Sequence, residues 1–295
     1  MAELPDESSA RKAMEPYDLA DEYGVSEPVE RPRVLPPAPS SLRTGLRAEA
    51  AEREPRTEPG RFPFFAGIFD FFLYPRTIAA WLLMSLGMTI TALGFVLCIW
   101  LLEVGLLIAA RCFAMPVALI GLLSFSYAAA CCLKVIEVTA AGYDEVEEWP
   151  SGLWRDWVWI LIPAAVMLAL AMAAGSIAAG LLSLPSWVGI GLGAHLLFPV
   201  FLVSSLESGS ATTFVSWTAL RGFVAVWWAW GLFYIETGVL LALWGVATVA
   251  AFPLEPFLTT LVAMPILGAV ALVYSRLVGR LLWCYAQAAE RGHGG

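Results

Sequence analysis

Four carboxylates lie within five residues in the stretch GYDEVEEWP, which runs from Gly142 to Pro150 and is called the acidic loop here. They belong to Asp144, Glu145, Glu147 and Glu148. If the stretch were helical, Asp144, Glu147 and Glu148 would share one face, and such oxygen clusters suit hard divalent cations. The alternating ligands and central glycine of a calcium loop are missing, so we expect a solvated acidic surface and no metal site.

The acidic loop could also dock basic side chains. Its partners would be arginines of another protein or those of the amino-terminal region, namely Arg31, Arg33, Arg43 and Arg47. The four carboxylates therefore form a candidate docking patch.

Two further residues could do chemistry inside long apolar runs: Glu236, in LFYIETGVL, and His195, in GLGAHLLFP. An ionised side chain at mid-membrane costs several kcal/mol, so Glu236 should not face lipid. It would either couple proton or cation movement or serve packing, protonated or hydrogen-bonded to a neighbouring helix. His195 would be a relay or a packing residue. Their similar depths in adjacent spans permit a contact between them.

Signatures of known catalysts and cofactor sites are missing from the sequence. There is no GxSxG elbow, HExxH, P-loop or kinase signature. The five cysteines show no CxxC or Cys/His metal spacing, which predicts small buried apolar residues. A net charge of −8 without a basic stripe argues against nucleic acid as a partner. We expect no enzymatic activity, no cofactor and no metal.

The elements that must position these residues are membrane helices. The chain is 59% hydrophobic and 14% charged, with a mean hydropathy of +0.74, outside the range of soluble domains. Continuous apolar runs without barrel alternation predict an all-α polytopic transmembrane bundle. Six spans are expected: Ile78 to Leu101, Leu106 or Phe113 to Ile136, Val158 to Leu182, Trp187 to Leu206, Val226 to Phe252, and Phe257 to Leu277.

The ends of the chain differ from this transmembrane region of residues 78–285. Residues 1–60 hold nine of the 19 prolines and 13 of the 25 acidic residues, which predicts a disordered cytoplasmic tail. The opening MAELPDESSA lacks the basic and apolar regions of a signal peptide. Residues 286–295 should be a flexible end.

Aromatic stretches precede three of the spans and suggest interfacial helices. The first is residues 61–77, with FPFFAGIFDFFLYP; the others are WPSGLWRDW and ATTFVSWTALRG. Gly189 and Gly193 form a small-residue face that predicts a close helix contact. Arg276 and Arg280, one turn apart near the end of the last span, should meet lipid phosphates.

Basic residues beside the spans predict the orientation. Lys134, Arg155 and Arg221 alternate onto the side of the amino-terminal region, whereas the turns at Ser183–Ser186 and Pro253–Pro256 carry no basic residue. We therefore expect a multi-pass protein of the cytoplasmic membrane with both termini in the cytosol. The acidic loop would face the cytosol and stand off the anionic lipid surface.

Three segments, FFLYPRT, CCLKVIEVTAAGYDEVEEWPSGLWRDW and RLVGRLLWCY, resemble a group of uncharacterised six-span membrane proteins from planctomycete-type bacteria. The resemblance covers roughly Phe62 to Tyr285. It implies the six-span architecture and a bacterial cytoplasmic membrane, and it brings no activity with it.

Two functions are compatible with these patterns. The first is a non-enzymatic membrane scaffold or assembly partner, which would contact the bilayer and another membrane or cytoplasmic protein through the tail and the acidic loop. The alternative is a small secondary transporter or channel, with Glu236 as its coupling residue and His195 nearby. A water-accessible cavity at Glu236 would favour the transporter, and dry packing would favour the scaffold.

Overall fold

The structure is a computed structural model, and it describes Phe64 and residues 67–152, 154–210, 213–251 and 255–293. The expected disordered tail of residues 1–60 lies outside these ranges, and so do its four arginines at positions 31, 33, 43 and 47.

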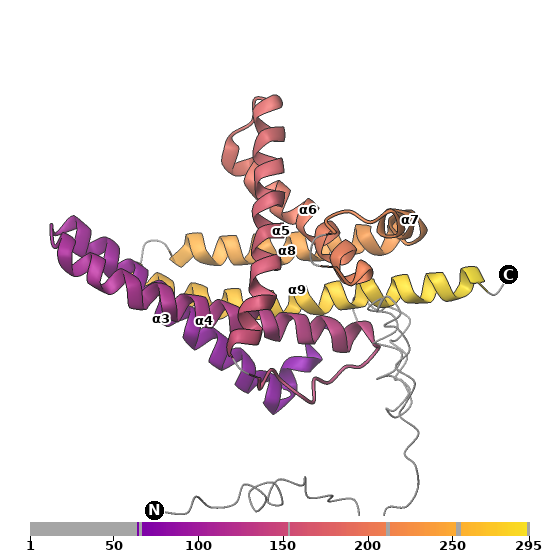
Figure 1. Ribbon diagram of the computed structural model, residues 1–295, viewed down its shortest axis with the longest axis horizontal. Helices are drawn as coiled ribbons and strands as arrows, with labels where there is room; N and C mark the ends of the chain where they lie inside the picture. Colours follow the sequence, from indigo (N-terminus) through magenta and orange to yellow (C-terminus); the bar gives the residue numbers. More distant parts are fainter. Residues whose placement is uncertain (1–63, 65–66, 153, 211–212, 252–254, 294–295) are drawn as a thin grey trace, which may run out of the picture. The chain divides into compact units, whose positions relative to one another are not determined.

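Six helices are long and apolar enough to cross a membrane (Figure 1). In the described ranges two shorter elements accompany them, the 3-10 helix η2 (Asp70–Leu73) and the helix α7 (Trp217–Ala225). The described residues contain no strand, which confirms the all-α, six-span prediction. The long helices are α3 (Pro75–Glu103), α4 (Leu107–Ala140), α5 (Trp154–Leu181), α6 (Ser186–Ser208), α8 (Trp227–Ala251) and α9 (Pro256–His293).

Local sequence explains where several helices begin and end. Pro75 opens α3 at its first turn, where a missing N–H costs nothing. Gly105, with φ at +82°, turns the chain between α3 and α4, so α4 begins at Leu107 and not at Phe113. The Ser216 hydroxyl caps α7 by accepting from the Ala219 N–H at 3.3 Å.

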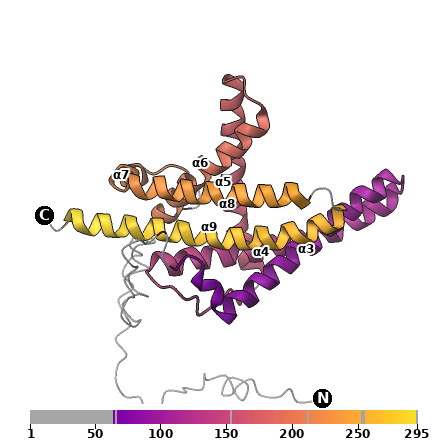
Figure 2. The ribbon, with the colours of Figure 1, turned by 180° about the vertical axis from the view of Figure 1, so that it is seen from behind.

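Helices α3, α4 and α9 pack against one another, and α8 packs along α9 (Figures 1 and 2). Helices α5 and α6 form a close pair that contacts α4 mainly through α5. The side chains buried most completely include Trp230, Phe233 and Leu281, together with the charged Arg276. Large apolar side chains remain exposed on all six long helices, as expected for surfaces that face lipid.

The contact between α5 and α6 is made by backbone against backbone. A Cβ atom added to Gly175 would collide with the backbone of Gly189 and Gly193, and one added to Gly193 would collide with Ala171. The predicted small-residue contact at Gly189 and Gly193 is therefore confirmed.

Both ends of the transmembrane region differ from expectation. In the first aromatic stretch, Phe64, Ile68 and Phe71 are buried in the main core, while Phe69 and Leu73 are exposed. Residues 67–74 form turns and the four-residue 3-10 helix η2, and the buried side chains pack inside the protein and not at an interface with lipid. At the other end α9 continues to His293, so most of the expected flexible end is helical.

Candidate functional site

The acidic loop leaves α4 at Gly142, whose φ of +90° suits glycine alone among common residues. From Tyr143 to Ser151 the chain is neither helix nor strand. The shared helical face expected for Asp144, Glu147 and Glu148 is therefore not formed. The loop connects α4 to α5, and its side chains point to different surroundings.

Asp144 is bound by two arginines of α9. Its Oδ1 atom accepts from Arg276 Nη2 at 2.7 Å and from Arg280 Nη2 at 2.6 Å. Its backbone carbonyl accepts a third bond, from Arg276 Nη1 at 2.8 Å. The Arg276 side chain is 1% exposed and that of Arg280 is 4% exposed, whereas the Asp144 side chain is 41% exposed. We call this group the Asp144 clamp.

The surroundings of the Asp144 clamp come from the first aromatic stretch. The Arg276 guanidinium lies over the Phe71 ring, 4.9 Å from its centroid, in cation–π geometry. A Cβ atom on Gly67 would lie 3.8 Å from both Asp70 Oδ2 and Arg280 Nη2, so the chain passes close to the arginines there. Arg276 and Arg280 therefore bind protein groups inside the molecule and do not extend to lipid phosphates, which corrects the sequence-based expectation.

A second set of contacts fixes the middle of the acidic loop. Arg76, at the start of α3, donates from Nη1 to the Glu147 carbonyl at 2.9 Å. Val146 is 2% exposed and belongs to the core cluster. The side chains of Glu145, Glu147 and Glu148 remain exposed. The loop thus lies against the protein, and three of its four carboxylates point outward.

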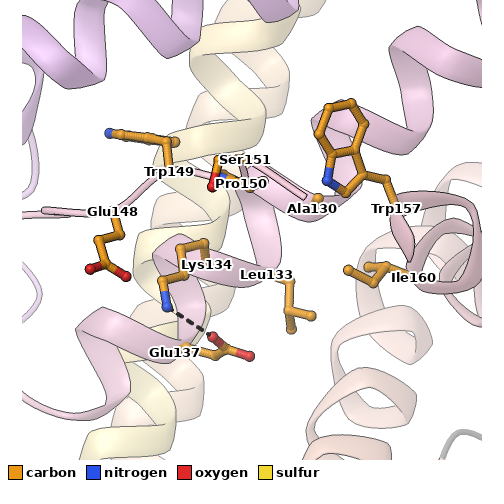
Figure 3. A pocket seen from close by; sticks show the side chains of 10 residues that line it. All are labelled: Ala130, Leu133, Lys134, Glu137, Glu148, Trp149, Pro150, Ser151, Trp157 and Ile160. Atoms are coloured by element: carbon orange, nitrogen blue, oxygen red, sulfur yellow. Dashed lines mark ion pairs between the residues drawn. The ribbon is translucent and has the colours of Figure 1, made fainter. Parts of the chain in front are cut away.

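A pocket of about 520 Å³ opens beside the loop, between α4 and the start of α5 (Figure 3). Lys134 and Glu137 line it from α4, 3.8 Å apart, and Glu148 approaches from the loop. The remaining lining residues are Ala130, Leu133, Trp149, Pro150, Ser151, Trp157 and Ile160. The pocket had no sequence signature, since its residues are spread over 31 positions and only folding brings them together.

Glu236 and His195 do not interact. His195 packs edge-on against Tyr234, with ring centroids 5.6 Å apart, and its Nε2 lies 3.7 Å from a Cβ placed on Gly238. Tyr234 and Gly238 share one face of α8, and Glu236 lies between them in sequence, about 200° around the helix. No hydrogen bond or ion pair joins Glu236 to His195, so the contact that their depths permitted is not made.

The Glu236 carboxylate is enclosed. Both of its oxygens are buried, and neither has a hydrogen-bond partner among the described residues. The polar side chains nearby on α8 and α9 bind protein groups. Tyr234 donates to the Leu196 carbonyl at 2.8 Å, and Trp230 donates to the Tyr285 hydroxyl at 3.0 Å. Neither Glu236 nor His195 lines the pocket beside the acidic loop.

Within the described ranges, no group of three or more His, Cys, Asp or Glu side chains could hold a metal ion. The acidic loop spreads its carboxylates apart, which explains why it forms no such group. In comparisons with protein-family models, with curated proteins and with solved structures, nothing matches this chain.

Proposed function

We propose that this protein is a non-enzymatic membrane scaffold that docks a basic segment of a partner protein on the acidic loop. The observation that carries the proposal is that the four acids of the loop have different surroundings. Asp144 fixes it to the buried arginines of α9, while Glu145, Glu147 and Glu148 stay exposed.

A fixed loop is a better docking surface than a mobile one. Its backbone is held at Asp144 and Glu147 by arginines from α9 and α3, and Val146 is anchored in the core. Binding therefore does not have to order the loop, which removes a cost that otherwise reduces affinity. Three exposed carboxylates in four residues favour a cationic partner, and such an interaction weakens with salt.

The proposal includes an orientation. In a cytoplasmic membrane with both termini in the cytosol, the acidic loop faces the cytosol, and its partner is a cytoplasmic protein or the cytoplasmic part of a membrane protein. The support is the distribution of Lys134, Arg155 and Arg221 beside the spans.

The experiment uses the full chain in lipid nanodiscs and a fluorescent octa-arginine peptide as the probe of a basic segment. Replacing Glu145, Glu147 and Glu148 together by Gln should weaken peptide binding at least tenfold at 50 mM salt. The matched control replaces three exposed acids elsewhere, Glu103→Gln, Asp156→Asn and Glu255→Gln. If peptide binding weakens equally in both triple variants, the peptide is attracted only by the net charge of the protein. That result would contradict docking at the loop.

A second candidate function rests on Glu236. A carboxyl group that is buried without a hydrogen-bond partner is costly, and such residues within membranes often mark ion or proton pathways. A small transporter or channel would use Glu236 as its coupling site, with His195 on the neighbouring helix. Proton and cation fluxes into liposomes containing the protein test this: a flux that Glu236→Gln abolishes would favour transport over the scaffold.

A further inference from the structure

The pocket between α4, the acidic loop and α5 shares Glu148 with the docking patch, and its other lining residues lie outside that patch. Its lining differs from one end to the other (Figure 3). Leu133 of α4 and Ile160 of α5 lie at one end, and Lys134, Glu137 and Glu148 lie at the other. The pocket therefore has an apolar end and a charged end.

The charged end carries both signs. Figure 3 shows the Lys134 ammonium directed toward Glu137, but the two are 3.8 Å apart, beyond the 2.7–2.9 Å of a close charge-assisted hydrogen bond. Lys134 forms no hydrogen bond with a described residue, and its side chain is 26% exposed. Its ammonium donors can therefore bind an incoming anion, while the carboxylates of Glu137 and Glu148 lie beside it.

Two indole rings complete the walls. Trp149 stands in the loop, and Trp157 lies in the first turn of α5, where it contacts the Tyr127 ring at 5.1 Å between centroids. Tryptophan is favoured at the depth of lipid headgroups, and its ring face attracts cations. The volume of about 520 Å³ is in the range of pockets that hold small molecules.

We propose that this pocket binds the headgroup of an aminophospholipid, a primary ammonium joined to a phosphodiester. The phosphate would bind Lys134, and the ammonium would donate to Glu148 and Glu137. The first segment of an acyl chain would lie along Leu133 and Ile160. Among the lining side chains the carboxylates of Glu137 and Glu148 outnumber the Lys134 ammonium, which disfavours an anionic lipid. A trimethylammonium headgroup has no N–H to donate to the carboxylates, which disfavours choline lipids.

The test is native mass spectrometry of the full chain in detergent, titrated with phosphatidylethanolamine, phosphatidylcholine and phosphatidylglycerol that carry the same acyl chains. The protein should bind the ethanolamine lipid several-fold more tightly than the other two. Lys134→Gln should weaken that binding roughly tenfold, the loss of one strong charge-assisted contact. Glu148→Gln should reduce the preference for ethanolamine over choline, a ratio that general destabilisation would not change.

Two matched controls lie on the same end of α5 and outside the pocket. Arg155→Gln removes one exposed positive charge, and Asp156→Asn removes one exposed negative charge. Both should keep the lipid preference. If Lys134→Gln does not fold, Ser151→Tyr fills the pocket from the loop and should abolish the preference without removing a charge.

Equal binding of the three lipids, or a preference that survives both Lys134→Gln and Ser151→Tyr, would overturn the proposal. A third result would also overturn it: no preference for the ethanolamine lipid, together with displacement of bound lipid by the octa-arginine peptide. The pocket would then be part of the protein docking surface. A preference for the choline lipid would assign cation recognition to the indole rings alone and would also overturn it.

Discussion

The carboxylate of Asp144 lies 2.7 Å from the guanidinium of Arg276, although 132 positions separate the two residues in the chain. This contact joins the connection between α4 and α5 to the last membrane-spanning helix. Arg276 is almost fully buried, and Asp144 is also shared with Arg280. The acidic loop is thus anchored to the folded core, and its outward carboxylates are presented from a fixed backbone.

Removing the charge of Asp144 should destabilise the protein. Asp144→Asn leaves two buried guanidinium groups with a neutral partner, and breaking a buried pair costs about 3–5 kcal/mol. Because the Asp144 side chain is 41% exposed, water screens part of this loss, and we expect about 2 kcal/mol. The measurement is the thermal unfolding midpoint in detergent.

The same variant should also release the loop. Cleavage by a glutamate-specific protease at Glu145, Glu147 or Glu148 should be slow in the original protein and fast in Asp144→Asn. Glu145→Gln, which changes an exposed acid next to the clamp, is the control and should shift the unfolding free energy by less than about 0.5 kcal/mol. An Asp144→Asn protein as stable and as resistant as this control would show that the clamp contributes nothing.

The sequence was sufficient for the six helices because each apolar run is long enough to cross a membrane, and its interruptions contain Gly, Pro or charged residues. The close contact at Gly189 and Gly193 was also predictable, since small residues four apart are a local pattern. The start of α4 was left open between Leu106 and Phe113. The mean hydropathy stays high between these two residues, and the start of α4 is set by the turn at Gly105.

The Asp144 clamp was not predictable in the same way. The sequence showed Arg276 and Arg280 one turn apart and showed four neighbouring acids, but pairing them requires knowing that α9 packs beside the end of α4. Without that contact, arginines at the end of an apolar helix are expected at the lipid headgroups. The same reasoning applies to Glu236 and His195: their places in consecutive apolar helices were predictable, but the helix rotation that separates them was not.

The α5–α6 pair should be sensitive to one methyl group at Gly193. Gly193→Ala places a Cβ against the backbone of Ala171 and Gly175, which cannot move aside as a side chain could. Forcing the helices apart should cost about 1–3 kcal/mol. Gly191→Ala is the control two residues away, where nothing lies within 4 Å, and it should be neutral or stabilise by up to about 1 kcal/mol. Unfolding midpoints in detergent distinguish the two, and equal midpoints would count against the contact.

Helix α7 should depend on Tyr285 for its attachment. The Tyr285 hydroxyl donates to the Ala219 carbonyl of α7 at 2.9 Å and accepts from Trp230 at 3.0 Å. Tyr285→Phe removes both bonds and leaves the Trp230 N–H unpaired, a loss of about 1–3 kcal/mol. Hydrogen exchange of the amides in Trp217–Ala225 should then accelerate. Tyr74→Phe, just before α3, is the control and should leave the exchange of these amides unchanged. If they exchange faster in Tyr74→Phe as well, or do not exchange faster in Tyr285→Phe, the Tyr285 hydroxyl does not hold α7.

If the protein is a scaffold, replacing Glu236 by an apolar residue should stabilise its fold. Its carboxylate oxygens are buried without a hydrogen-bond partner among the described residues, so the group opposes folding by its lost solvation. Glu236→Met keeps a similar volume, and we expect the protein to gain about 1–2 kcal/mol in unfolding free energy. Glu255→Met, at an exposed position, controls for added hydrophobicity. A destabilised Glu236→Met protein would mean that the carboxylate has a polar partner in the membrane.

The orientation makes a prediction for labelling with a thiol reagent that does not cross membranes. Cys112 is exposed in the structure, so it is first replaced by Ser, and the remaining four cysteines are buried or half-buried. A cysteine at Glu145 should react only after the membrane is permeabilised. A cysteine at Ser186, the exposed first residue of α6, should react in intact cells, because the turn before it lies at the other end of α5. The opposite pattern would place the acidic loop outside the cell and would exclude a cytoplasmic partner for it.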